Sequence, residues 1–279
     1  MSLSPYLQAP TQPPKQPKVA LFITCLVDAM RPNVGFATVK LLTAAGCQVE
    51  VPTLQTCCGQ PAHNSGAKQD TQKLARQNIK KFAEFDYVIA PSGSCIGMLH
   101  QYPDLFALGS AEHQAAEDLA RRAWEITSFL VDVMQFELPP LQQDVQVTYH
   151  DSCGGLRELG IQQQPRQLLS QVTGLSLNEM CEADTCCGFG GTFCVKFPDI
   201  SNRMVSNKTA NAEQSKAQLL LGGDLGCLMN MAGKLKRENS DLQTRHVTEL
   251  LADMLAAPAL GEAENTPLRA ANTDLGYRV

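Results

Sequence analysis

The tripeptide Cys-Cys-Gly occurs twice in this chain, at residues 57–59 and 186–188, and each copy lies between two more distant cysteines. The upstream gap is 31 residues in the first copy and 32 in the second, and the downstream gaps are 36 and 39 residues. Eight of the eleven cysteines repeat one spacing, which indicates an internal duplication that must bring four thiols together twice. The two sets are Cys25, Cys57, Cys58 and Cys95, and Cys153, Cys186, Cys187 and Cys227.

Short apolar runs alternate with amphipathic stretches in both halves of the chain. The runs predict strands that are buried on both faces, and the stretches with apolar residues at helical spacing predict helices. Such alternation calls for parallel strands joined by right-handed crossovers, so we expect an α/β fold of two tandem Rossmann-like lobes with parallel sheets. Strands are predicted at 19–23, 48–51, 87–90, 145–149, 175–178 and 217–221. Helices are predicted at 33–45, 67–85, 112–136, 165–172, 200–217, 228–236 and 247–255.

The duplication divides the chain into two domains with a further segment at each end. Residues 18–143 are expected to form the first Cys-Cys-Gly domain and residues 144–257 the second, with the predicted helix 112–136 as a bridge. Residues 1–17 carry five prolines and are expected to be a disordered tail. Residues 258–279 have little apolar content and are expected to be a loose C-terminal tail.

The composition excludes several classes of partner. With a formal charge of -5 and no basic run, the 279-residue chain offers no surface for nucleic acid. No apolar stretch reaches the roughly 20 residues that span a bilayer, and residues 1–17 lack the apolar core of a secretory signal. Cytoplasmic localisation without direct membrane insertion is therefore expected. Because a reducing cytoplasm keeps thiols free, the eleven cysteines indicate metal binding or redox chemistry rather than disulfides.

The cysteines of the first lobe follow predicted strands. Cys25, the Cys57-Cys58 pair and Cys95 each fall in a loop directly after such a strand. Because the carboxyl ends of parallel strands share one edge of a sheet, and ligands gather there, we expect these thiols to meet. The second lobe repeats the plan.

Four thiolates can hold either an iron–sulfur cluster or zinc. Structural zinc sites usually combine two pairs of cysteines that are two to four residues apart, whereas the adjacent cysteines here are consecutive. Consecutive side chains reach different irons of one cluster more easily than two corners of one tetrahedron, so iron–sulfur is favoured. Gly59 and Gly188 lack a β-carbon and let the backbone approach a bulky inorganic core. Zinc binding at one of the two sites remains an alternative.

Five segments of the chain resemble the cysteine-rich domains that are named for their Cys-Cys-Gly motif. Such domains occur in heterodisulfide reductase, in the iron–sulfur subunit of glycolate oxidase and in lactate-utilisation proteins. The resemblance covers about residues 18–256 and is strongest to the lactate-utilisation members. The segments are Thr24–Asp28, Cys57–Gly66, Pro91–Cys95, Cys186–Phe193 and Gly226–Asn230.

The resemblance implies an iron–sulfur electron-transfer subunit of a complex that oxidises L-lactate to pyruvate and allows growth on lactate. It implies two partner subunits, at least one with iron–sulfur clusters, and a small 2-hydroxy acid as the substrate of the complex. The chain has no flavin or nicotinamide fingerprint, so we expect a subunit rather than a complete enzyme. Two alternatives stay open: a heterodisulfide-reductase-like or glycolate-oxidase-type iron–sulfur redox subunit, and a zinc-binding structural scaffold.

The chain departs from the family's ligand pattern at two positions. That pattern ends in Cys-x-x-Cys, and here Ser92 and Asp224 replace the first cysteine of each pair. With four cysteines per domain, the expected cofactor is a [4Fe-4S] cluster, at up to two sites. Ser92 and Asp224 are expected to act through hydrogen bonds around the ligands rather than as ligands.

Three further cysteines lie outside the repeated spacing. Cys47 is interpreted as a small buried hydrophobe, and Cys181 as structural because the first lobe has no counterpart. Cys194, seven residues past Cys187, is either a structural thiol or a ligand or redox-active thiol.

Three charged or titratable residues lie close to the repeated cysteines. His63 and His150 are either structural residues or groups that hydrogen-bond a cluster sulfur or relay a proton. Arg157 either forms a surface ion pair or neutralises an anionic cluster or substrate.

Overall fold

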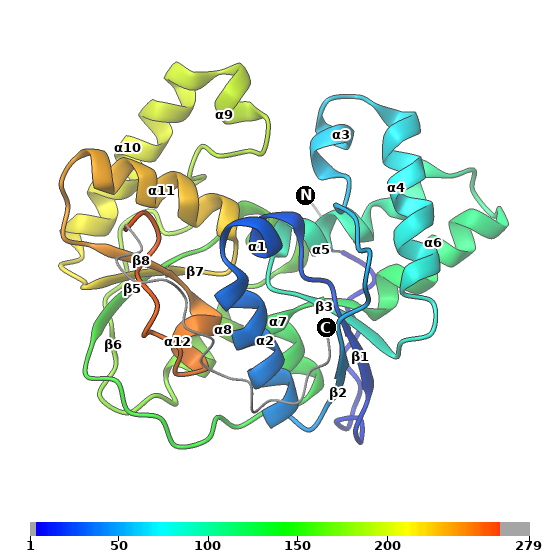
Figure 1. Cartoon of the computed structure of the whole chain (residues 1–279), viewed down its shortest axis with the longest axis horizontal. Coiled ribbons are helices and arrows are strands. Elements are labelled where there is room, and N and C mark those ends of the chain that lie inside the picture. The colour runs from blue at the N-terminus through cyan, green and yellow to red at the C-terminus, as the bar shows by residue number, and fades with distance from the viewer. Residues whose placement is uncertain (1–3, 263–279) are drawn as a thin grey trace.

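The computed structural model describes residues 4–262, which form two four-stranded sheets, all of whose strands are parallel (Figure 1). The strand orders are β2-β1-β3-β4 and β6-β5-β7-β8, so the two sheets have one topology. This confirms the predicted α/β fold with two duplicated lobes. The first sheet contains β1 (Lys18–Leu21), β2 (Gln48–Glu50), β3 (Tyr87–Ala90) and β4 (Ala123–Glu125). The second contains β5 (Gln146–His150), β6 (Ser176–Leu177), β7 (Leu219–Gly222) and β8 (Gln243–His246).

The register of the sheets repeats along with their order. Val19 pairs with Val49 and Tyr87 in the first sheet, and Val147 pairs with Leu177 and Leu219 in the second. Val19 and Val147 stand equally far before Cys25 and Cys153 in the sequence. The duplication therefore extends from the cysteine spacing to the hydrogen-bonded ladders.

Helices form an inner layer between the two sheets. The largest core of the molecule lies here, and it contains buried side chains of both lobes. Helix α2 packs against α12 and α7 against α8, so equivalent helices make the contact twice. The inner layer contains α2 (Pro32–Ala44), α7 (Ile126–Ser128) with the π-helical turn Phe129–Val133, α8 (Gln163–Leu169) and α12 (Val247–Leu251).

Other helices cover the outer face of each sheet, and strand residues alternate between the two layers. Val19 faces the inner core and Ala20 the outer one, as do Leu219 and Leu220. Over the first sheet lie α4 (Lys68–Lys81), α5 (Gly93–His100) and α6 (Ala111–Arg122), with the 3-10 turn Tyr102–Leu105. Over the second lie α10 (Pro198–Gln214) and α11 (Leu225–Arg237).

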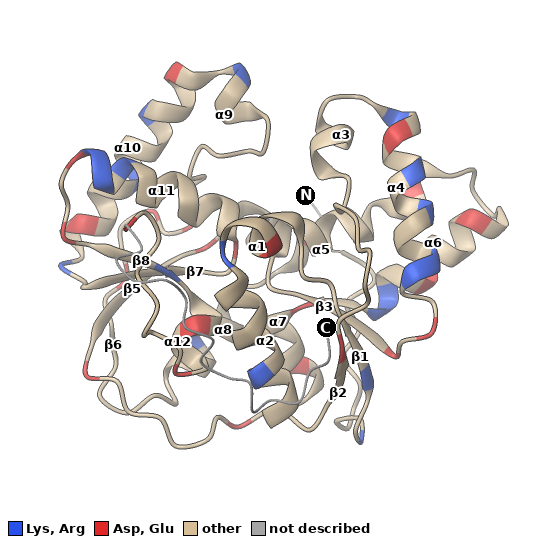
Figure 2. Cartoon of the chain, viewed as in Figure 1, with Lys and Arg blue, Asp and Glu red and all other residues tan. Residues whose placement is uncertain are grey.

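Short helical elements occupy the loops near the cysteines. Helices α3 and α9 each follow a Cys-Cys-Gly tripeptide and lie at the top of the view in Figure 1. Figure 2 shows charges of both signs interspersed along the outer helices α4, α6 and α10. The short elements are α1 (Cys25–Met30), α3 (Gln60–Asn64), α9 (Phe193–Lys196) and the π-helical turn Gly154–Glu158.

The predicted helix 112–136 is wrong in its middle. Helix α6 ends at Arg122, and the next three residues form β4, which pairs with β3. All three are buried and β4 lies on the edge of its sheet, so the run is too short for its period to separate strand from helix.

Strand β8 was also missed. Its sequence Gln-Thr-Arg-His is polar, yet Arg245 and His246 are buried. Arg245 donates to the carbonyl of Ala257, and His246 hydrogen-bonds the carbonyl of Pro91, so burial leaves these side chains partnered.

Parts of both terminal segments contact the lobes. Ser4 hydrogen-bonds His100 at 2.7 Å, and Leu7 packs against both the inner core and the outer core of the first lobe. Ala259 is buried, and the rest of the expected C-terminal tail, residues 263–279, lies outside the described residues. The domain boundaries stay predictions. Within residues 4–262, no helix combines the length and the apolar character needed to cross a bilayer.

Candidate metal centres

The fold places the repeated cysteines at the starts of helical elements beyond the carboxyl ends of the strands. Cys25 begins α1, and Cys95 and Cys227 lie in the first turns of α5 and α11. Cys153 directly precedes a π-helical turn. Backbone N–H groups at such ends favour negative charge, so these positions suit thiolates.

The first set of four thiols converges as expected. The Sγ atoms of Cys25 and Cys57 lie 3.9 Å apart. Cys58 hydrogen-bonds both Cys57 and Cys95 through its thiol, which closes the chain of contacts. Hydrogen bonds from the thiols of Cys25 and Cys58 lower the pKa of Cys57 to about 2. The same contacts, together with burial, raise the pKa values of Cys25 and Cys58.

The second set repeats this arrangement. Hydrogen bonds from Cys153 and Cys187 lower the pKa of Cys186 to about 2, and Cys187 also contacts Cys227 through its thiol. The pKa of Cys187 is raised by these hydrogen bonds and by its burial. In each set the thiols of two neighbouring cysteines thus donate to one sulfur atom, and a soft metal displaces thiol protons from such a group of sulfur atoms.

The glycine of each tripeptide turns the backbone toward the preceding cysteine. Gly59 has a φ of 90° and Gly188 a φ of 82°, a region that favours glycine. Each donates its N–H to the first sulfur of the pair, over 3.4 Å. A β-carbon on Gly188 would also lie 2.8 Å from the carbonyl oxygen of Ser201. Local geometry therefore requires glycine at both positions, whereas the predicted approach of this backbone to an inorganic core stays a prediction.

Side chains from the outer helices hold the cysteine loops by their carbonyl groups. In the first lobe Asn78 donates to the carbonyl of Cys57 over 3.1 Å, and Tyr102 to that of Cys58 over 2.7 Å. In the second lobe Asn230 donates to the carbonyl of Cys187 over 2.9 Å. These groups fix the loop backbone without using the sulfur atoms.

Lys208, like Asn78 and Tyr102, holds a cysteine loop and was not predicted from the sequence. It lies in α10, 1% exposed, and its ammonium group donates to the carbonyls of Glu182 and Ala183 in the loop before Cys186. Burial lowers its pKa. A signal was present, because Lys208 follows Val205 and precedes Ala212 at the spacing of one buried helix face.

His150 is a buried residue beside the second thiol set that has no polar counterpart in the first lobe. It ends β5 and is 1% exposed, and burial, with the charge of Lys208, lowers its pKa to about 3. One ligand atom each from His150, Cys187 and Cys227 lie within 4.8 Å of one another. In the first lobe Phe22 stands at the same distance before its cysteine, and it is fully buried.

Ser92 and Asp224 join the two lobes. They form an isolated antiparallel bridge, and the Asp224 carboxylate accepts from the Ser92 hydroxyl over 3.2 Å and from the backbone N–H of Ser94 over 3.0 Å. Ser92 also caps the N–H of Cys95. Both residues thus act through hydrogen bonds beside the cysteines in this structure.

The first thiol set borders a cavity of about 1020 Å³. Cys25 and Cys57 line it, together with Thr24 and the largely apolar walls of α2 and the loop after β2. Gln55 fixes this loop by donating to the carbonyl of Leu21 over 2.8 Å. A small molecule can therefore reach the exposed side of the first set.

The remaining candidate residues lie apart from the two sets or are exposed. Cys47 is buried in the inner core, as interpreted, and Cys181 is exposed. Cys194 donates to the carbonyl of Gly191 over 3.4 Å. His63 in α3 and Arg157 are both exposed.

Both sets have the donor chemistry of a thiolate metal centre. Each supplies four sulfur atoms, a glycine N–H directed at sulfur and a position beside helix N-termini. The residues therefore fit an iron–sulfur cluster, and they also fit zinc.

Comparison with known proteins agrees with the duplication. The family model described as "Cysteine-rich domain" (CCG) matches residues 19–100 and again residues 147–232. A protein named lactate utilization protein A from Oceanobacillus iheyensis is 47% identical over 84% of this chain and 96% of its own length. Proteins of that name from Halalkalibacterium halodurans and Bacillus licheniformis are each 45% identical over 84% of this chain, covering 96% and 98% of their lengths.

A solved structure shares the fold at low sequence identity. A hypothetical protein from Helicobacter pylori superposes with a TM-score of 0.60 and 13% identity, over 92% of this chain and 52% of that one. The chain thus spans about half the length of that protein, and the likeness concerns the fold alone. Each of the two family matches contains one whole thiol set and three of the four strands of one sheet, so the chain belongs to the Cys-Cys-Gly family of cysteine-rich domains, with two domains in tandem.

Proposed function

We propose that this chain is an iron–sulfur electron-transfer subunit of a complex that oxidises L-lactate to pyruvate. The relatives' names support a role in lactate utilisation. The observation that carries the electron-transfer part is the convergence of two thiol quartets, in which each cysteine contacts another member of its set through its thiol. Cys25, Cys57, Cys58 and Cys95 would bind one [4Fe-4S] cluster, and Cys153, Cys186, Cys187 and Cys227 the other.

The chain's residues would hold the cofactors rather than transform the substrate. Such a cluster supplies one-electron redox chemistry when it is bound. The glycine N–H groups and the helix N-termini stabilise the negative charge on the sulfur atoms. Asn78, Tyr102 and Asn230 keep the cysteine loops in place, and the outer cores exclude water from Cys58 and Cys187.

Partner subunits and a cytoplasmic location belong to this proposal. Large apolar side chains are exposed beside the first thiol set and on α9, which is typical of surfaces that bind other proteins. Phe36 and Leu54 are exposed and line the cavity with Cys25, and Val195, next to Cys194, is also exposed. We propose two partners, at least one with iron–sulfur clusters, that deliver electrons from a small 2-hydroxy acid.

Iron and sulfide analysis of anaerobically purified protein, with electron paramagnetic resonance (EPR), tests the cofactor. We expect iron and acid-labile sulfide at both centres in the wild type, and loss of the first centre alone in Cys25→Ala. Cys47→Ala is the matched control, since it removes a core thiol outside both sets. Colourless protein with zinc and no iron would replace this proposal with the zinc scaffold.

Growth on L-lactate as sole carbon source tests the biological role. A deletion strain without a duplicate gene should fail to grow, and plasmid-borne wild type should restore growth where Cys25→Ala does not. Normal growth of the deletion strain would contradict the lactate assignment.

The cavity beside Cys25 and Cys57 favours a second candidate function. A small thiol or disulfide could reach the first centre there, as in a heterodisulfide-reductase-like protein. Turnover of a disulfide by the isolated, cluster-loaded protein with a chemical electron donor would support this candidate over electron transfer alone.

A further inference from the structure

We propose that His150 is a metal ligand of the second centre, acting together with Cys187 and Cys227. The second centre would then be a mixed thiolate–imidazole site, whereas the first is bound by thiolates alone. This inference rests on the proposed function only in taking the second cysteine set as a metal site.

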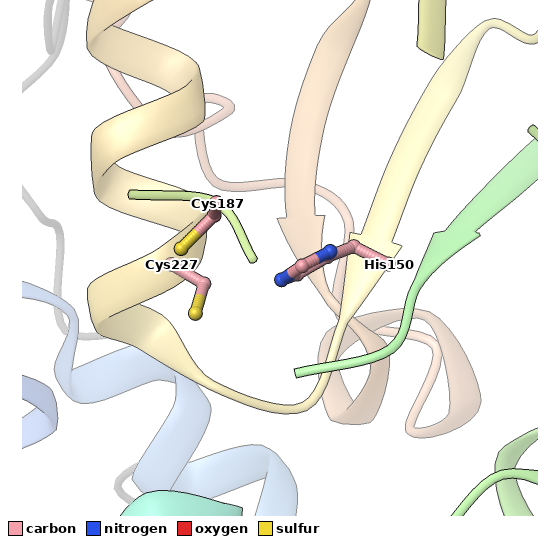
Figure 3. A group of neighbouring side chains, drawn as sticks. All are labelled: His150, Cys187 and Cys227. Atoms are coloured by element: carbon pink, nitrogen blue, oxygen red, sulfur yellow. The ribbon is translucent and has the colours of Figure 1, made fainter. Parts of the chain in front are cut away.

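The donor atoms of His150, Cys187 and Cys227 lie close enough together to bind one metal ion. His150, Cys187 and Cys227 are buried, and their ligand atoms all lie within 4.8 Å of one another. Figure 3 shows the imidazole of His150 with a ring nitrogen turned toward the two sulfur atoms. Two ligands on one tetrahedral metal stand about 3.5–3.8 Å apart, given metal–sulfur and metal–nitrogen bonds of about 2.3 and 2.0 Å. A small movement of these side chains would therefore bring their ligand atoms to the spacing of ligands around one metal ion.

His150 differs from the other buried histidines in its hydrogen bonding. Both ring nitrogens of His150 are buried without a hydrogen-bond partner among the described residues. His100 and His246, which are also buried, each have partners on both nitrogens. A buried polar group left without a partner costs about 1–3 kcal/mol, so such groups are rare in native proteins. A metal ion is a partner that satisfies an imidazole nitrogen without a hydrogen bond.

The first lobe has an apolar residue at the position that corresponds to His150. Phe22 occupies the corresponding position of the first lobe, where it packs against Phe82 in the outer core. The fold therefore does not require a polar residue at the end of this strand. The imidazole is specific to the second lobe, where it lies near the buried ammonium group of Lys208.

An imidazole ligand changes the redox properties of the centre in a known direction. The second set then offers five donors, and an imidazole that takes the place of one of the four thiolates lowers the negative charge on a cluster and raises its reduction potential. With His150 as a ligand, the second centre should have the higher potential of the two. Electrons would then collect on the second lobe.

Nitrogen hyperfine spectroscopy on the reduced, cluster-loaded full chain is the test. We expect a nitrogen coupling of the strength of a directly bound imidazole, which changes isotope pattern when the protein is labelled with ¹⁵N-histidine. The variant His150→Phe, which copies the first lobe, should lose this coupling and lower the potential of the second centre. His113→Phe removes a histidine on the surface helix α6 and should leave both unchanged.

The outcomes separate this inference from the proposed function. Absence of metal from both centres would defeat the proposed function. Two loaded centres with no direct nitrogen coupling, or with one as weak as that of a hydrogen-bonded nitrogen, would defeat the His150 assignment alone. The labelling arm needs no variant, so it stands even if His150→Phe fails to fold. If the second centre takes up zinc, X-ray absorption should show a nitrogen neighbour at about 2.0–2.1 Å, and all-sulfur coordination would overturn the proposal.

Discussion

Residues in equivalent positions of the two lobes differ in how tightly their surroundings constrain them. Gly59 and Gly188 have similar backbone angles and make the same N–H to sulfur contact. Their surroundings differ, because a β-carbon on Gly59 would find only ordinary contacts at 3.6 Å, with Thr71 and Leu74. The Cys-Cys-Gly glycine of the second centre is therefore less tolerant of substitution than that of the first.

Substitution of these two glycines by alanine should have unequal effects. Both variants place alanine at a positive φ, which costs about 1–2 kcal/mol. Gly188→Ala adds a clash with the backbone of Ser201, so we expect a larger loss of unfolding free energy and loss of metal from the second centre. Urea unfolding and metal analysis measure this, and equal effects of the two substitutions would contradict the geometry.

Glu125 should make stability depend on pH near neutrality. Burial raises its pKa from 4.5 to about 7, and one carboxylate oxygen has no hydrogen-bond partner. Because the folded pKa is the higher one, the folded state holds a proton that the unfolded state releases. This stabilisation is complete below about pH 4.5 and is lost as the pH rises through about 7.

The variant Glu125→Gln isolates this effect. Glutamine keeps an acceptor for the N–H groups of Thr127 and Ser128 but has no charge. Its stability relative to the wild type should rise between pH 4.5 and pH 8 by up to about 3 kcal/mol, at about 1.4 kcal/mol per pKa unit. A difference in unfolding free energy that stays flat over this range would refute the prediction. Comparing the two proteins also cancels the titration of buried histidines.

The starts of α5 and α11 make a polar contact between the two lobes. Asp224 stands at the N-cap position of α11, yet its carboxylate accepts no hydrogen bond from that helix. It accepts instead from Ser94 at the start of α5 in the other lobe. One lobe thus caps a helix of the other.

Asp224→Ala should loosen this junction. It leaves the Ser94 N–H and the Ser92 hydroxyl without their acceptor, so we expect a loss of about 1–3 kcal/mol in unfolding free energy. Thermal or urea unfolding of the metal-free protein measures it, which separates the junction from metal binding. Asp241→Ala, at an exposed aspartate, is the control and should change stability by less than about 0.5 kcal/mol. Equal behaviour of the two variants would show that the cap does not contribute.

The sequence was informative about elements that have a clear period or a repeated motif. The strands around Val19 and Val147 and the thiol sets after them were predictable, because buried apolar runs and the doubled spacing are local signals. Strand β4 is too short for its period to show, and β8 is polar. The missing partners of His150 depend on three-dimensional packing, and no sequence pattern reports them.

The whole molecule is built around one core that both lobes share. Leu41 and Ile89 of the first lobe lie in the same apolar cluster as Val147 and Leu250 of the second. Helices of both lobes lie between the sheets, so neither lobe encloses its own inner face. Independent folding of the two halves is therefore not expected.

Unfolding of the metal-free chain should be a single transition. Trp124 is the one tryptophan of the chain and lies in β4, so its fluorescence reports on the first lobe, while circular dichroism reports on both. The two curves should coincide. Leu250→Ala in the second lobe should shift the Trp124 curve by about 2–5 kcal/mol, because it opens a cavity in the shared core. Separate transitions, or a Trp124 curve unmoved by this variant, would mean that the lobes unfold independently.

The two lobes also meet where backbone lies directly against backbone. A β-carbon on Gly93 would lie 2.7 Å from the Cα of Gly155, and one on Gly154 would lie 2.9 Å from the Cα of Ser94. Cys95 and Cys153 are one residue from this junction. Only small side chains stand at this contact, so the two backbone segments pack directly and leave no room for the lobes to approach one another further at this point. In the proposed electron-transfer role, this contact would set the path between the two thiol sets, so we expect the docking of partners, rather than bending of this chain, to gate electron flow.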